Sequence, residues 1–173
     1  MGIKKMCECS GLATLNETDT QIFANICPSC FKEGSIVTFI TTFDTSGFSF
    51  SSNSVNRPEC LFSNGQSILN TNGTGTLTRD DETFPVTFTL NLVDGPEEND
   101  DIIVINFAGI DTTGQVFFSS FGFFGLEEER VTVTSCNSIP INNDLISSRT
   151  NRNIGYGFKE IKIYSKGKSY HYN

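Results

Sequence analysis

Residues 83–93 read TFPVTFTLNLV, and this stretch decides the fold class. Phe, Val, Phe, Leu and Leu occupy every second position, while Pro, Thr, Thr and Asn fill the positions between them. Successive side chains of a β-strand point to opposite faces, so the alternation predicts a strand with one buried face and one solvated face. Pro85 has no backbone N–H to donate, which favours a strand that starts on a free edge.

The same two-residue period recurs along most of the chain, and no helical period of any length accompanies it. Asn64-Gly65 and Asn72-Gly73 are dipeptides typical of tight turns with positive φ. Further strands are predicted at residues 35–43, 47–52, 67–70, 75–79, 101–107, 115–124 and 130–136. The pattern predicts an all-β protein: a single, jelly-roll-like β-sandwich of about eight antiparallel strands.

The predicted organisation has three parts. Residues 1–33 are rich in cysteine and polar residues and are predicted to form an N-terminal arm. Residues 34–136 form the sandwich. Residues 137–173 form a basic C-terminal extension, with one more strand expected at residues 157–165 (GFKEIKIYS).

Charge is distributed unevenly around a net of −8. Residues 1–144 carry 6 basic and 19 acidic side chains, a net of −13, whereas residues 145–173 carry 6 basic and 1 acidic, a net of +5. An acidic body repels phosphate, so a nucleic-acid partner is not expected. The basic extension is expected to contact the acidic body of its own chain or of a neighbour.

Two observations bear on location. No segment is apolar for long enough to span a bilayer, so membrane insertion is not expected. Residues 1–6 carry positive charge, but no apolar stretch follows them, and a cleavable signal peptide is therefore not predicted.

The cysteines are the main candidate site residues. Four lie in the N-terminal segment and two in the body: Cys7, Cys9, Cys27, Cys30, Cys60 and Cys136. Disulfides or cross-links between subunits are the first interpretation, with Cys60 and Cys136 either bridging each other or accepting a bond from another subunit's arm. Four N-terminal thiolates also suffice for a tetrahedral zinc site, and unpaired thiols are the third alternative.

Two other features are candidates for binding. The acidic loop between two predicted strands offers Asp94, Glu97, Asp100 and Asp101 as ligands for Ca²⁺, although an acidic hairpin loop is more often only solvated. The strand at residues 115–124 is apolar on both faces, which indicates either a subunit interface or a surface covered by the C-terminal strand. The predicted interface residues are Phe117, Phe118, Phe121 and Phe123.

Catalysis is not expected. The one histidine, His171, lies two residues from the end of the sequence, which is a poor position for a preorganised base. No second histidine is present to build a Ser-His-Asp or Cys-His arrangement. No cofactor is expected other than the zinc or calcium already considered.

The turn and strand pattern that includes residues 72–76 (NGTGT) and 100–105 (DDIIVI) resembles small β-modules of bacterial surface proteins. A short cysteine-bearing arm before a jelly roll is similar to the subunits of bacterial endospore appendages and related spore-surface proteins. That resemblance implies an arm that reaches into neighbouring subunits and forms disulfides along a fibre, with Cys7 and Cys9 as the donors. It also implies a location on a cell or spore surface, reached after assembly.

The sequence therefore predicts a non-enzymatic structural subunit of a surface or fibre assembly, a homo-oligomer or filament held by sandwich contacts and arm disulfides. Two alternatives remain open. One is a surface adhesion or carbohydrate-binding module, with or without calcium, and the other is a zinc-stabilised intracellular domain.

Overall fold

A computed structural model describes residues 6–42, 47–127, 129–136, 163–165 and 168–170. These residues confirm the all-β prediction and add a single 3-10 turn, η1 (Pro28–Cys30). The strands are β1 (Cys9–Asn16), β2 (Thr20–Ile26), β3 (Ile36–Thr41), β4 (Phe48–Val55), β5 (Glu59–Ser63), β6 (Gln66–Arg79), β7 (Glu82–Asp94), β8 (Asp101–Ile110), β9 (Val116–Leu126), β10 (Val131–Ser135), β11 (Ile163–Ser165) and β12 (Lys168–Tyr170).

Ten of these strands form one antiparallel sheet in the order β10-β1-β2-β3-β4-β6-β7-β8-β9, with β5 paired to the first part of β6. Most neighbours in the sheet are consecutive in sequence, because short turns favour antiparallel pairing of successive strands. The exceptions are β4, which pairs with β6, and β10, which returns to pair with β1. Its return leaves β9 and β10 at the two ends of this order, while β5, which pairs only with β6, is a further edge strand.

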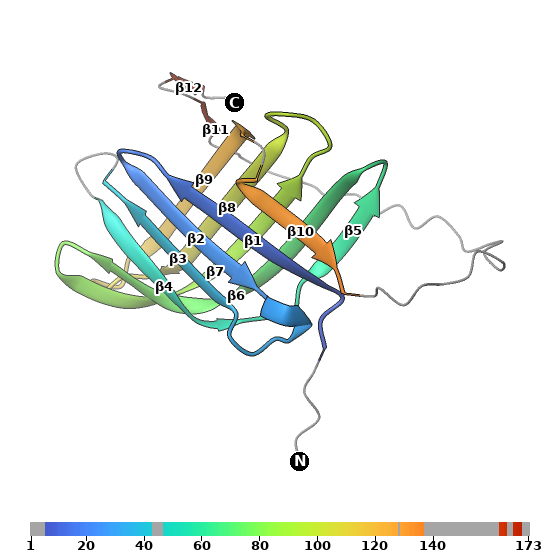
Figure 1. Cartoon of the computed structure of the whole chain (residues 1–173). Coiled ribbons are helices and arrows are strands. Elements are labelled where there is room, and N and C mark those ends of the chain that lie inside the picture. Colours follow the sequence, from blue (N-terminus) through green and yellow to red (C-terminus); the bar gives the residue numbers. More distant parts are fainter. Residues whose placement is uncertain (1–5, 43–46, 128, 137–162, 166–167, 171–173) are drawn as a thin grey trace, which may run out of the picture.

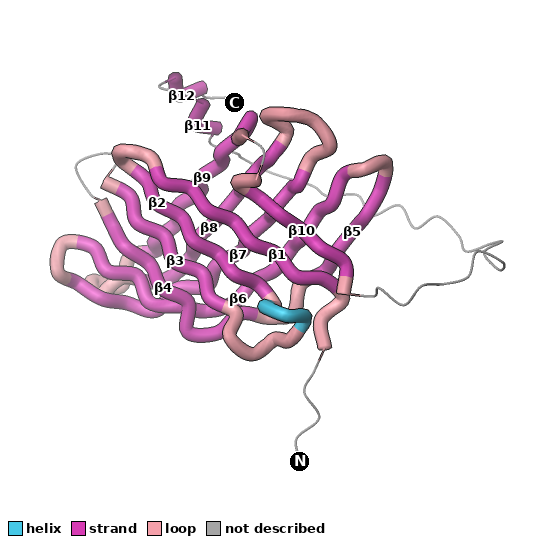
Figure 2. The backbone as a smooth tube through the Cα atoms, in the orientation of Figure 1, coloured by secondary structure: helices cyan, strands magenta, loops and turns pink. Residues whose placement is uncertain are grey.

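The sheet curls over so that two layers face each other. Figure 1 shows β1, β2, β3 and β10 crossing in front of β7, β8 and β9, and the tube of Figure 2 shows the same arrangement. The layers approach closely at Gly11 of β1, where an added β-carbon would lie 2.6 Å from the Leu69 side chain of β6. A glycine at this position lets the two layers pack without displacing that leucine.

Phenylalanine rings fill the space between the layers. Phe107 of β8 is fully buried, with its ring centroid 5.3 Å from that of Phe39 and 4.8 Å from that of Phe50. Phe39 in turn lies 4.7 Å from Phe121 of β9 and 5.5 Å from Phe48. Rings from β3, β4, β8 and β9 thus form one aromatic cluster that joins both layers.

The prediction that residues 1–33 form an N-terminal arm is wrong. β1 and β2 lie inside the sheet, and β1 pairs with β2 on one side and with β10 on the other. The sandwich therefore begins at Cys9 rather than at residue 34. The alternation was difficult to recognise because the inward positions include the small residues Cys9, Gly11, Ala13 and Ala24, which give little hydrophobic contrast.

Most of the strand predicted at residues 157–165 lies outside the described residues. Residues 163–165 are described and form β11. β11 pairs with β12 and lies against β9.

Candidate interaction surface

All six cysteines form disulfides within the chain, and the three bonds lie at the end of the sheet where β1 begins and β2 ends. The disulfides are Cys7–Cys27, Cys9–Cys60 and Cys30–Cys136, with Cα–Cα distances of 6.3, 6.4 and 5.6 Å. These distances fall in the usual range of about 4.4–6.8 Å for disulfides. Backbone hydrogen bonds hold the same region together: the N–H of Cys7 donates to the carbonyl of Cys30, and the N–H of Cys136 to that of Glu8.

Each disulfide joins segments that are distant in sequence or belong to different layers. Cys9–Cys60 links β1 of one layer to β5 of the other. Cys30–Cys136 links η1 to the residue that follows β10. The cysteines thus lock the curled sheet closed at one end.

This pairing corrects the expected roles of the cysteines. Their assignment to disulfides is right, but the bonds lie within one chain instead of between subunits, and Cys60 and Cys136 do not bridge each other. No cysteine is free, so no thiolate remains for a zinc site or for a bond to a neighbour. The reason is that β1 and β2 place the N-terminal cysteines against the body itself.

Two carboxylates of the predicted calcium loop hold the outer edge of β10. Asp101 is buried, and its Oδ2 accepts a hydrogen bond of 2.9 Å from the Val131 N–H while its Oδ1 accepts one from the Gly95 N–H. Asp94 accepts a 2.8 Å hydrogen bond from the Val133 N–H. Two N–H groups of β10 that point away from β1, those of Val131 and Val133, are therefore satisfied, which opposes the pairing of a further strand at this edge.

The same contacts give the predicted calcium site no support. Asp94 and Asp101 are engaged with backbone N–H groups, whereas Glu97 and Asp100 lie exposed in the loop. In the part of the chain that the structure describes, no group of three or more His, Cys, Asp or Glu side chains is placed to hold a metal ion.

Replacing Asp101 with alanine is expected to lower the free energy of unfolding by about 2–4 kcal/mol, because buried N–H donors would lose a charged acceptor. Urea denaturation measures the change. Glu98→Ala, in the same loop but exposed, is the matched control and is expected to change stability by less than about 0.5 kcal/mol. Equal losses in the two variants would contradict the role assigned to Asp101.

The Phe-rich strand β9 turns most of its predicted interface residues inward. Phe117 is buried against Phe48 and Phe84, and the Arg79 guanidinium lies over its ring at 5.4 Å from the centroid. Phe121 and Phe123 pack against the core. Of the four predicted interface residues only Phe118 is well exposed, at 65%.

The outer face of the β6–β9 layer is polar in the middle. Thr89, Asn106 and Ser120 lie opposite one another on β7, β8 and β9. The Asn106 amide donates to the Thr89 hydroxyl at 2.9 Å and accepts from the Ser120 hydroxyl at 2.5 Å. These side chains satisfy each other across the strands, as cross-strand polar pairs do.

Apolar side chains flank this polar band on both sides. On one side, Ile110, Val116 and Phe118 are 61%, 84% and 65% exposed, and we refer to them as the apolar corner. Ile110 and Val116 are direct partners across β8 and β9. On the other side an apolar row crosses five strands through directly paired residues: Leu61, Ile68, Val93, Ile102 and Phe124.

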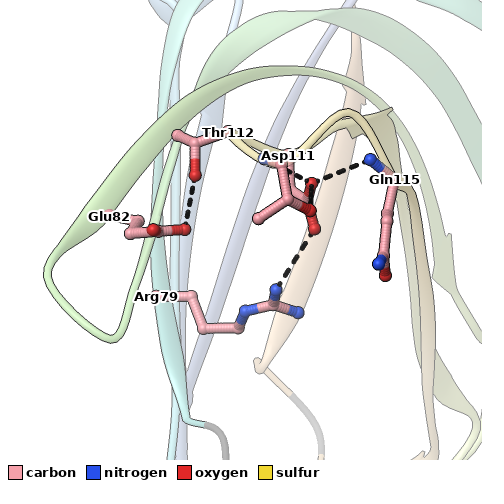
Figure 3. A network of polar contacts seen from close by, with 6 residues as sticks. Arg79, Glu82, Asp111, Thr112 and Gln115 are labelled. Carbon is pink, nitrogen blue, oxygen red and sulfur yellow. Dashed lines mark hydrogen bonds and ion pairs between the residues drawn. The ribbon is translucent and has the colours of Figure 1, made fainter.

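A polar network fixes the turn that carries the apolar corner (Figure 3). Asp111 Oδ1 accepts hydrogen bonds from the N–H and hydroxyl of Thr113 and from the N–H of Gln115, and Arg79 lies 3.7 Å from Asp111 Oδ2. The Thr113 hydroxyl, more than any other partner, lowers the pKa of Asp111 below its ordinary value; the backbone N–H groups and Arg79 act in the same direction. Thr112 donates to Glu82, so the β6–β7 and β8–β9 turns are held together.

Sequence reasoning missed most of this surface. Ile110 and Val116 flank the DTTGQ turn, and Leu61 lies in a strand that was not predicted. The available signal was the two-faced apolar pattern of residues 115–124, which indicated an exposed face but not which side chains formed it. Cross-strand register, which one sequence does not reveal, brings Ile110 beside Val116.

The fold and this surface define the class of protein: an all-β, disulfide-locked curled sheet with an exposed apolar corner. Comparisons with protein-family models, curated proteins and solved structures find no match. Among the described residues, no helix has the length and apolar character needed to cross a membrane.

Proposed function

We propose that this chain is a non-enzymatic structural subunit of a surface or fibre assembly, and that copies associate through the outer face of β8 and β9. The observation that carries the proposal is the apolar corner. Three large apolar side chains stand side by side on a rigid sheet with more than half of each side chain in solvent. Contiguous exposed apolar groups of this kind mark interaction sites.

Two features of the chain support a surface location and a role in assembly. The chain contains three disulfides. Disulfides form and persist in oxidising environments such as the cell exterior and are rare where thiols are kept reduced. The network around Asp111 fixes the turn between Ile110 and Val116, so a partner would meet a preorganised surface and lose little conformational freedom on binding.

The alternatives considered from the sequence have less support. Polar side chains on β4 and β6 hydrogen-bond to one another, as Asn53 does with Thr76 and Ser54 with Thr74, which leaves fewer donors and acceptors for a glycan. A zinc-stabilised domain would need free thiolates, and all six cysteines are in disulfides.

The test is sedimentation equilibrium of the oxidised protein over a range of protein concentrations, together with a denaturing gel run without reductant to detect covalent bonds between copies. The native chain is expected to self-associate without reductant-sensitive covalent bonds between copies. Val116→Thr with Phe118→Thr is expected to weaken association about 100-fold, because two apolar side chains that are buried on association contribute about 3 kcal/mol. Both residues are exposed in the single chain, so its stability should change little.

The matched control is Phe23→Thr with Ile40→Thr, two exposed apolar residues on the outer face of the other layer. This variant is expected to associate as the native chain does. A native chain that stays monomeric at every concentration would overturn the proposal, as would a corner variant that associates normally.

A further inference from the structure

The two end strands of the sheet differ in how their outer edges are covered. The edge of β10 is blocked by Asp101 and Asp94, whose carboxylates accept hydrogen bonds from the outward N–H groups of Val131 and Val133. β9 ends the sheet on the other side, and β11, from the C-terminal extension, lies against it (Figure 1). An uncovered edge strand invites pairing with another chain, so the cover on β9 bears on how the protein associates.

Acidic side chains gather at the end of β9 that meets the 95–100 loop. Asn99 of that loop lies beside Gly125, and Asp101 pairs with Leu126. Five acidic residues near this end are exposed: Glu97, Glu98, Asp100, Glu127 and Glu129. Arg130 pairs with Glu127 at 3.6 Å, which leaves a clear excess of negative charge.

The same end of β9 also has an apolar component. Phe124, the last member of the apolar row, is exposed there. A segment that combines positive charge with apolar residues would complement this place. Residues 145–173 carry a net charge of +5, and β11 within them reads Ile-Tyr-Ser.

We infer that the basic C-terminal extension is an internal cover for the β9 edge. It docks on its own chain, with the β11–β12 hairpin against β9 and its basic side chains facing the acidic residues at the end of that strand. In this arrangement both end strands are blocked, one by carboxylates and one by the extension. Copies then do not associate by adding strands at the outer edges of β9 or β10.

The composition of the chain supplies a direct probe. The protein has no Trp, and its four tyrosines all lie in the extension: Tyr156, Tyr164, Tyr170 and Tyr172. Intrinsic tyrosine fluorescence of the full chain therefore reports on the extension alone. Acrylamide quenching of that fluorescence measures how well the extension is protected from solvent.

At low ionic strength the tyrosines are expected to be protected from acrylamide relative to free N-acetyltyrosinamide. Protection should fall in about 1 M NaCl, where the Debye length is about 3 Å and attraction between exposed charges is screened. Glu97→Lys with Glu98→Lys and Asp100→Lys should cause the same loss of protection at low salt. Glu17→Lys with Glu33→Lys and Glu59→Lys, which makes the same change in net charge at other exposed sites, should not.

Three outcomes would overturn the inference: quenching equal to that of the free amino-acid derivative at all salt concentrations, equal loss of protection in both triple variants, or protection that grows with protein concentration. The last result would mean that the extension docks on a second copy. Self-association is measured separately by sedimentation, so a failure of this inference and a failure of the proposed function can be told apart.

Discussion

Replacing Cys30 and Cys136 with alanine is expected to lower the free energy of unfolding by about 3–5 kcal/mol. The bond joins residues 106 positions apart, and closing a loop of that length removes a large conformational entropy from the unfolded chain. Domains of ordinary stability unfold at a cost of about 5–15 kcal/mol, so this one bond accounts for a large share. Urea denaturation of the oxidised proteins measures the loss.

The matched control is Cys7→Ala with Cys27→Ala, which removes a bond between residues only 20 positions apart. Because loop entropy grows with the logarithm of loop length, this loss should be smaller by about 1.5 kcal/mol. Two equally stable variants, or a Cys30–Cys136 variant as stable as the native protein, would contradict the assigned pairing. Peptide mapping without reductant provides an independent check of the three bonds.

Phe107→Ala is expected to destabilise the fold by about 3–5 kcal/mol, the usual loss when a buried Phe is truncated. The ring is fully buried, and it contacts rings from both layers, including Phe39, Phe50 and Phe121. Its removal leaves a cavity at the centre of the aromatic cluster and weakens the packing between the layers. The thermal midpoint and the urea midpoint should both fall.

Phe118→Ala is the control, since Phe118 lies on the neighbouring strand and its ring is exposed. Its stability should stay within about 0.5 kcal/mol of the native value. If truncating the exposed ring proved as costly as truncating the buried one, the inside and outside faces of β8 and β9 would have been assigned the wrong way round.

Strong periodicity made some parts of the fold predictable. In residues 83–93 each inward position carries a large apolar side chain, and β7 covers this whole stretch with the expected face buried. β1 and β2 were missed because cysteine, glycine and alanine fill many of their inward positions. Small residues are needed there because the two layers approach closely, and that approach is a property of the folded sheet.

The candidate site was less predictable than the fold. The Phe-rich strand was identified as a surface feature, but its four named phenylalanines mostly face the core, and the exposed corner is completed by Ile110 from the other side of a turn. The acidic loop looked like a cation site because its carboxylates are close in sequence. In the fold, Asp94 and Asp101 instead accept hydrogen bonds from a strand that lies 30 or more residues further along the chain.

The sequence by itself determined that this protein is all-β, that its body is acidic and its C-terminal extension basic, and that it contains one histidine. These are properties of composition and of local period, which need no knowledge of distant contacts. The tertiary structure alone decided which cysteines pair, which carboxylates close an edge, and which apolar side chains face solvent. Each of these depends on strand order and register, and so on contacts between residues that are far apart in the chain.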